Sequence, residues 1–258
     1  MIRRHCWSVA ILAALVTTVQ VTAARAEDED ARALLQRVVD AAPKVPFVAK
    51  VKLSSTSRGW TRDLQLSHKR LNDNEEGSFM EVTSPQDVKG TRFLLLDRSD
   101  GSSVQYIFVP AVRRAIQISA ETRKQQFLGS DFYVYDLAKP NLDAYTHSFV
   151  GEEDIAGRHS KLIQSVAKNP ENELYSKTVL AVDPTDLVIV RSQLFDSKGK
   201  LLKVWTNEKL EKIDGQWTPV RQRMSNVQDS TDSLLEITEI HYNAEVPDEL
   251  FTKGYLTR

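Results

Sequence analysis

From residue 47 to residue 242, the sequence consists largely of short runs in which apolar and polar residues alternate. A period of two is typical of β-strands with one buried and one exposed face. Turn signals separate the runs, and Asp100-Gly101 and Asp214-Gly215 are typical of β-hairpins. We expect about ten or eleven strands, and turns this short join antiparallel neighbours. The sequence therefore predicts a large antiparallel sheet.

One segment has a helical pattern instead. Between Asp28 and Ala42, apolar residues fall on one face at helical spacing, and Pro43 follows. Strands and helices do not alternate along the chain, which argues against a parallel α/β sheet. A sheet of this size curls strongly, and only this helix and residues 119–145 are available to cover its apolar face. We expect an α+β fold, a curved antiparallel half-barrel with an apolar hollow on its concave side.

The first residues have the features of a secretory signal peptide. Two arginines precede an apolar run, which ends in Ala24-Arg25-Ala26, with small residues at the positions that a signal peptidase inspects. We expect residues 1–26 to be removed after Ala26, leaving one exported, periplasmic domain over residues 27–258. Cys6, the sole cysteine, lies before the apolar run, so neither a disulfide nor a lipoprotein anchor is expected.

The charge of the chain argues against a nucleic-acid partner. It holds 34 Lys and Arg against 35 Asp and Glu, and loss of the three arginines in residues 1–26 leaves 31 against 35, a net charge of −4. Nucleic-acid binding would require a concentrated basic surface instead. No later run is long and apolar enough to predict a transmembrane helix. We expect a monomer.

The residues with the most specific placement lie between Gly90 and Leu137. Pro110 is followed by Arg113 and Arg114, which have two interpretations. In the first interpretation, the two arginines contact an anion or a lipid head group at the rim of the hollow. Alternatively, they are solvated arginines at the start of a strand, with one of them paired to a nearby aspartate.

A second part of this stretch is the run from Phe127 to Phe132. Its aromatic residues either form a lid over the hollow or belong to the ordinary core. Within it, Gly129 suits a backbone conformation that other residues resist, and Ser130 or Asp131 can cap a turn. If the rings face the hollow, replacing Phe127 or Phe132 with alanine should weaken ligand retention more than fold stability.

Motifs of enzyme chemistry are not found. The sequence has no dinucleotide-binding, phosphate-loop or nucleophile-elbow motif, although Ser130 and scattered carboxylates leave a hydrolase open as an alternative. The histidines after residue 26 are far apart in the sequence, and we expect them to be solvated on sheet faces. We expect no catalytic residues, no metal and no cofactor.

Several of these residues together resemble the outer-membrane lipoprotein-sorting protein family, the LolA-like group. The resemblance covers nearly the whole chain after residue 26, and its most specific part is the run from Phe127 to Phe132. The other matching residues are Lys89-Gly90-Thr91, Phe108-Val109-Pro110-Ala111-Val112-Arg113-Arg114, Ile116, Tyr135-Asp136-Leu137, Val182-Asp183, Phe195 to Lys200, Gly215 to Pro219 and Pro247 to Phe251.

The resemblance implies a half-barrel that carries lipid or the acyl chains of a lipoprotein through the periplasm. It also implies an RND-type inner-membrane transporter as partner, and no catalytic residues. A periplasmic sensor or regulatory module of envelope stress is the alternative. With the motif Gly129, Ser130 and Asp131 and the rim Arg113 and Arg114, the residues expected to line the hollow or its lid are Phe47, Val51, Leu64, Leu66, Met80, Phe93, Tyr106, Phe108, Phe127, Phe132 and Trp205.

Overall fold

One antiparallel sheet accounts for most of the computed structural model, which describes residues 31–258. The predicted signal peptide and the start of the predicted helix lie outside the described residues, and residues 31–41 are helical. The strands are β1 (Phe47–Ser55), β2 (Trp60–Asn72), β3 (Glu75–Ser84), β4 (Arg92–Arg98), β5 (Ser103–Val109), β6 (Arg114–Gln117), β7 (Tyr145–Ile155), β8 (Arg158–Ala167), β9 (Lys177–Asp183), β10 (Val188–Phe195), β11 (Leu201–Ile213), β12 (Gln216–Asn226) and β13 (Thr231–Tyr242).

The described chain thus holds thirteen strands rather than the ten or eleven expected. The strand β6 has only four residues, too few for a clear alternation, and β2 and β3 are longer strands joined by a tight turn. The short 3-10 helices are η1 (Thr122–Lys124), η2 (Phe127–Gly129), η3 (Val134–Leu137), η4 (Leu142–Ala144), η5 (Asp248–Phe251) and η6 (Tyr255–Thr257).

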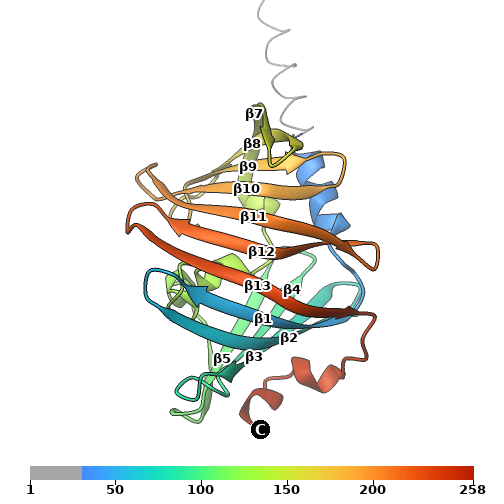
Figure 1. Ribbon diagram of the computed structural model, residues 1–258, viewed down its shortest axis with the longest axis vertical. Helices are drawn as coiled ribbons and strands as arrows, with labels where there is room; N and C mark the ends of the chain where they lie inside the picture. The colour runs from blue at the N-terminus through green and yellow to red at the C-terminus, as the bar shows by residue number, and fades with distance from the viewer. Residues whose placement is uncertain (1–30) are drawn as a thin grey trace, which may run out of the picture.

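The order of the strands determines where the rest of the chain must go. It runs β6-β5-β4-β3-β2-β1-β13-β12-β11-β10-β9-β8-β7, so β1 and β13 pair at the centre while β6 and β7 form the two open edges (Figure 1). Because β6 and β7 follow each other in sequence, their connection has to cross the whole width of the sheet. We call this connection, residues 118–144, the crossing segment.

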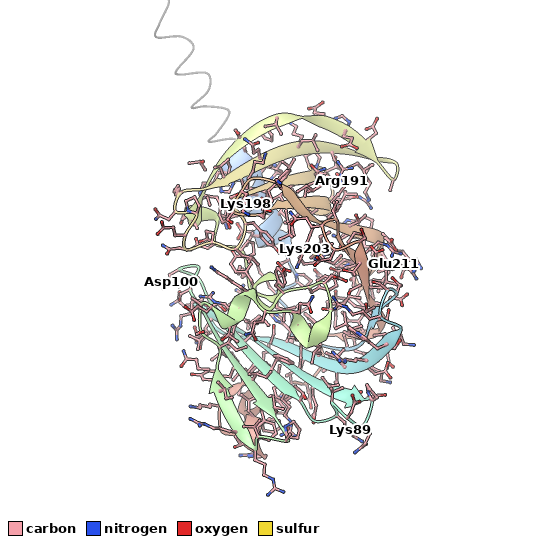
Figure 2. All side chains as sticks on the ribbon, turned by 90° about the vertical axis from the view of Figure 1, so that its left-hand side faces the viewer. Lys89, Asp100, Arg191, Lys198, Lys203 and Glu211 are labelled. Carbon is pink, nitrogen blue, oxygen red and sulfur yellow. The ribbon has the colours of Figure 1, made fainter. Side chains whose placement is uncertain are left out.

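The crossing segment packs onto the concave face of the sheet. Its buried residues Phe127, Phe132 and Val134 join a core with Val51 of β1 and Met224 of β12. In Figure 2 the segment lies between the two halves of the sheet, which curl around it. The predicted curved, unclosed antiparallel half-barrel, with helices on its concave side, is therefore confirmed.

The opposite face of β3 to β5 is covered by the C-terminal segment, which contains η5 and η6. Phe251 and Leu256 from this segment pack against Phe79 and Leu94. The approach is so close at β3 that a side chain on Gly77 would collide with the ring of Phe251. The two faces of this part of the sheet therefore both belong to the core.

Candidate functional site

A large apolar hollow lies on the concave face, between the N-terminal helix and the crossing segment. Its volume is about 550 Å³, within the range of about 300–1,000 Å³ that is usual for ligand sites. A second hollow of about 540 Å³ is lined mainly by charged and amide side chains near the β2–β3 and β4–β5 turns. We take the apolar hollow, called the cavity below, as the candidate site.

Three parts of the chain build the cavity. The helix contributes Leu35 and Val38, and strands β9 to β11 contribute a floor that includes Leu180, Leu194 and Trp205. The helix is held in place because its other apolar positions, Ala31 and Leu34, are buried against Ile163 and Val182. The remaining wall is the crossing segment, with the short connection between β8 and β9. The amphipathic helix therefore covers one end of the sheet while leaving space beside it.

One wall of the cavity carries a hydrogen-bonded polar group. Tyr145 donates its hydroxyl proton to Glu173 Oε2 over 3.0 Å, and Tyr135 donates to the same oxygen. The two phenol oxygens lie 3.1 Å apart. Burial raises the pKa of both tyrosines well above the ordinary value for a phenol, so they remain donors. The carboxylate of Glu173 is thus bonded within the wall.

The motif predicted at residues 129–131 fastens the crossing segment to the sheet. Asp131 is fully buried and accepts hydrogen bonds from Thr231 and Ser233 of β13, at 2.5 and 2.6 Å. Ser130, also buried, donates its hydroxyl proton to the carbonyl of Phe127 over 2.7 Å. Gly129 has φ of +70°, in the region that favours glycine. These contacts explain the motif as an anchor, and the buried hydroxyl of Ser130 argues against its use as a nucleophile.

A buried lysine on β11 lies under the same segment. The side chain of Lys203 has no solvent exposure, and its ammonium donates to the carbonyl of Asp131 and lies 2.9 Å from the ring centroid of Tyr133. Asp136 Oδ2 is 4.0 Å away, and that carboxylate also accepts from the hydroxyl of Tyr175 over 2.7 Å. In Figure 2, Lys203 lies between the upper strands and the crossing segment.

Burial lowers the pKa of Lys203 from its ordinary 10.5 to about 8, although Asp136, Asp131 and Asp229 act in the opposite direction. Between pH 8 and pH 10.5 the unfolded lysine binds the proton that the folded one has lost. The free energy of unfolding should therefore rise with pH across this window, relative to a Lys203→Met variant. Urea unfolding of both proteins at pH 7, 8, 9 and 10 measures this difference, and parallel curves would contradict the assignment.

Two histidines depart from the expectation of solvated side chains. His68 is half-buried and stacks on Phe47. His147 of β7 is buried at the edge of the cavity. Its Nε2 lies 2.9 Å from the carbonyl of Leu142 and its Nδ1 lies 2.7 Å from Ser165 Oγ. The carbonyl can only accept, so Nε2 carries the proton and Nδ1 accepts from the serine. Burial lowers the pKa of His147, and the ring is a structural contact between β7, β8 and η4.

The predicted cavity residues fall into three groups. Trp205 lines the cavity. Tyr106 and Phe108 were placed on the wrong face, because β4 and β5 are apolar on both sides and the C-terminal segment covers their outer face. The others do not line the cavity and belong to the core between the crossing segment and the concave face of the sheet: Phe47, Val51, Leu64, Leu66, Met80, Phe93, Phe127 and Phe132.

The two arginines predicted to form the rim lie away from the cavity. Arg113 and Arg114 are exposed at the turn before and the start of β6, and neither lines the cavity. The nearby aspartates that could have paired with them, Asp131 and Asp136, face β13 and Lys203 instead. The basic residues that do line the cavity are Arg123, Lys124 and Lys139, and the first two come ten residues later in the sequence than the predicted pair. No spacing rule distinguishes the two pairs, because the path of the crossing segment decides which one reaches the cavity.

Two further observations limit the chemistry. Among residues 31–258, no group of three or more His, Cys, Asp or Glu side chains is arranged to hold a metal ion. Across the same residues, no helix is both long and apolar enough to pass through a bilayer. The cavity thus offers apolar surface, fixed phenol and carboxylate groups, and cations.

Comparisons with known proteins agree with this architecture. A family model described as that of an uncharacterized protein matches residues 74–258. No curated protein sequence matches the chain. The fold is similar to a domain from Vibrio parahaemolyticus named as an outer membrane lipoprotein-sorting protein, with a TM-score of 0.83 and 21% identity, covering 90% of this chain and all of that one.

Two other solved structures are similar. A DUF1329 family protein from Desulfovibrio piger has a TM-score of 0.82 and 21% identity, covering 89% of this chain and 99% of that one. A LolA superfamily protein from Nitrosomonas europaea has a TM-score of 0.64 and 19% identity, covering 87% of this chain and 98% of that one. The chain therefore belongs to the family whose model spans residues 74–258, and it has the fold of the LolA-like, outer membrane lipoprotein-sorting proteins.

Proposed function

We propose that this protein is a periplasmic carrier that holds a lipid, or the acyl chains of a lipoprotein, in the cavity. The observation that carries the proposal is an apolar cavity of about 550 Å³ beside a helix on an unclosed sheet. Each methylene group moved from water into such a site contributes about 0.8 kcal/mol. Acyl chains would therefore bind well through apolar contact alone. The similar folds of lipoprotein-sorting proteins support the same role.

Delivery requires a partner, and we propose an RND-type inner-membrane transporter. A ligand passes from one protein to another only when the second protein binds it more favourably. The cavity therefore has to release its ligand when the carrier contacts that partner. Co-purification of the two from detergent extracts tests this part separately. A sensor of envelope stress could use the same cavity, but no contact in residues 31–258 favours that alternative.

Native mass spectrometry of protein purified from the periplasm tests the carrier proposal directly. We expect a bound lipid that survives gentle ionisation and is lost on denaturation. If the purified protein holds no lipid and takes up none from added vesicles, the proposal is refuted.

A variant that fills the cavity gives a sharper result. Thr178 of β9 lines the cavity, whereas its neighbour Val179 points to the opposite face because side chains alternate along a strand. Thr178→Trp should reduce the amount of bound lipid severalfold, since the indole occupies space that acyl chains need. Val179→Trp is the matched control and should retain lipid like the wild type. Equal retention by both variants would place the ligand outside this cavity.

A further inference from the structure

Three cationic side chains of the crossing segment line the cavity: Arg123, Lys124 and Lys139. Lys124 is exposed and the other two are half-buried, whereas Tyr175 on the opposite wall is only 3% exposed. The cations therefore occupy the solvent-facing side of a cavity whose interior is apolar. An apolar body with a charged end is the shape of ligand that such a site accommodates.

The charges of two of these cations are not balanced by the protein. Among residues 31–258, neither Arg123 nor Lys124 has a carboxylate oxygen within 4.0 Å, and Lys139 has only Glu76, at 3.8 Å. By contrast, Arg158, Arg191 and Arg221 on the sheet each lie within 2.7 Å of a carboxylate oxygen.

Two carboxylates also line the cavity, and both are bonded within the wall. Asp136 accepts from Tyr175 and from the backbone N–H of Tyr133, and its side chain is only 3% exposed. Glu173 accepts from the hydroxyls of Tyr135 and Tyr145. Three cations and two carboxylates therefore line the cavity, so the net charge of its lining is positive, and the cations lie at its solvent-facing side.

Resting on the carrier function proposed above, we infer that the cargo has an anionic head group, a phosphate or a carboxylate, held by Arg123 and Lys124. The guanidinium can bind either anion through two parallel hydrogen bonds, and Lys124 adds a point charge beside it. The acyl chains then extend over the floor toward Leu180 and Trp205. The head group decides which lipid is selected, and the chains supply most of the affinity.

The test compares ligands that share chains and differ in head group. Delipidated protein is mixed with equal amounts of dioleoyl phosphatidylglycerol and dioleoylglycerol, and bound species are counted by native mass spectrometry. We expect the anionic lipid to bind about ten- to a hundredfold more tightly, as one or two charge-assisted hydrogen bonds would give. Oleic acid against oleyl alcohol, in a second arm, shows whether a carboxylate suffices or a phosphate is needed.

The chain offers a matched control for the cations. Arg123→Gln/Lys124→Gln should lose the preference for the anionic lipid while binding dioleoylglycerol as the wild type does. Arg113→Gln/Arg114→Gln removes the same number of charges from exposed residues outside the cavity and should keep the preference. Equal binding of charged and neutral lipids by the wild type, or equal loss in both variants, overturns the inference but leaves the carrier function standing. Failure of every lipid to bind would instead refute the carrier function.

Discussion

Replacing Lys203 with methionine is expected to lower the free energy of unfolding by about 3–5 kcal/mol, the usual cost of removing one partner from a buried pair of charges. Methionine fills the space of the lysine stem but leaves Asp136, whose side chain is 3% exposed, without a cation. It also removes the hydrogen bond to the carbonyl of Asp131. Because that bond connects β11 to the crossing segment, the replacement should mainly destabilise the packing of the crossing segment, which forms a wall of the cavity.

Urea unfolding at pH 7 measures the effect. Lys209→Met makes the same replacement on the same strand, where the lysine pairs with Glu211 and is 62% exposed, and it should change stability little. The double variant Lys203→Met/Asp136→Asn removes both charges and should recover much of the loss, since a neutral amide is less costly to bury than an unpaired carboxylate. A single variant as stable as Lys209→Met would show that Lys203 and Asp136 do not interact.

Lys203 also shows what the sequence could have revealed. It is two residues from Trp205, so the two side chains face the same way along β11. Trp205 was assigned to the hollow, and the same reasoning puts a lysine inside it. An inward lysine requires a buried acceptor and a counter-charge, but the carbonyl of Asp131 and the carboxylate of Asp136 are far away in sequence and reach it only through the path of the crossing segment. The position was thus predictable, and the partner was not.

The sheet itself was predictable for the same physical reason. Alternation along strands such as β10, where every second residue from Val188 to Leu194 is buried, indicates one covered face. Alternation does not identify the inward face of a strand when both faces of the sheet are covered. Phe93, Leu94 and Leu95 of β4 are all buried, because the crossing segment lies on one side and the C-terminal segment on the other. With no polar face as a reference, the direction of Tyr106 and Phe108 on the next strand could not be assigned.

The two phenylalanines of the crossing segment are expected to differ in function but not in stability. Phe127 is 2% and Phe132 is 1% exposed, so each replacement with alanine should cost about 3–5 kcal/mol of unfolding free energy. These exposures place both rings in the core. Phe127 meets Phe93, at 4.7 Å between ring centroids, whereas Phe132 meets Trp205 edge to face at 5.6 Å.

Only the contact between Phe132 and Trp205 reaches the cavity, because Trp205 is one of the residues that line the cavity. Trp205 is otherwise held by a hydrogen bond from its Nε1–H to Gln222 Oε1, of 3.1 Å. Without Phe132 the indole is free to tilt away from its position in the cavity floor, so Phe132→Ala should lower lipid retention per folded molecule, and Phe127→Ala should not. Native mass spectrometry in the absence of denaturant measures retention, and circular dichroism during urea unfolding measures stability. Equal retention in the two variants, at equal stability, would mean that the floor keeps its shape without Phe132 and that this ring contributes to the core alone.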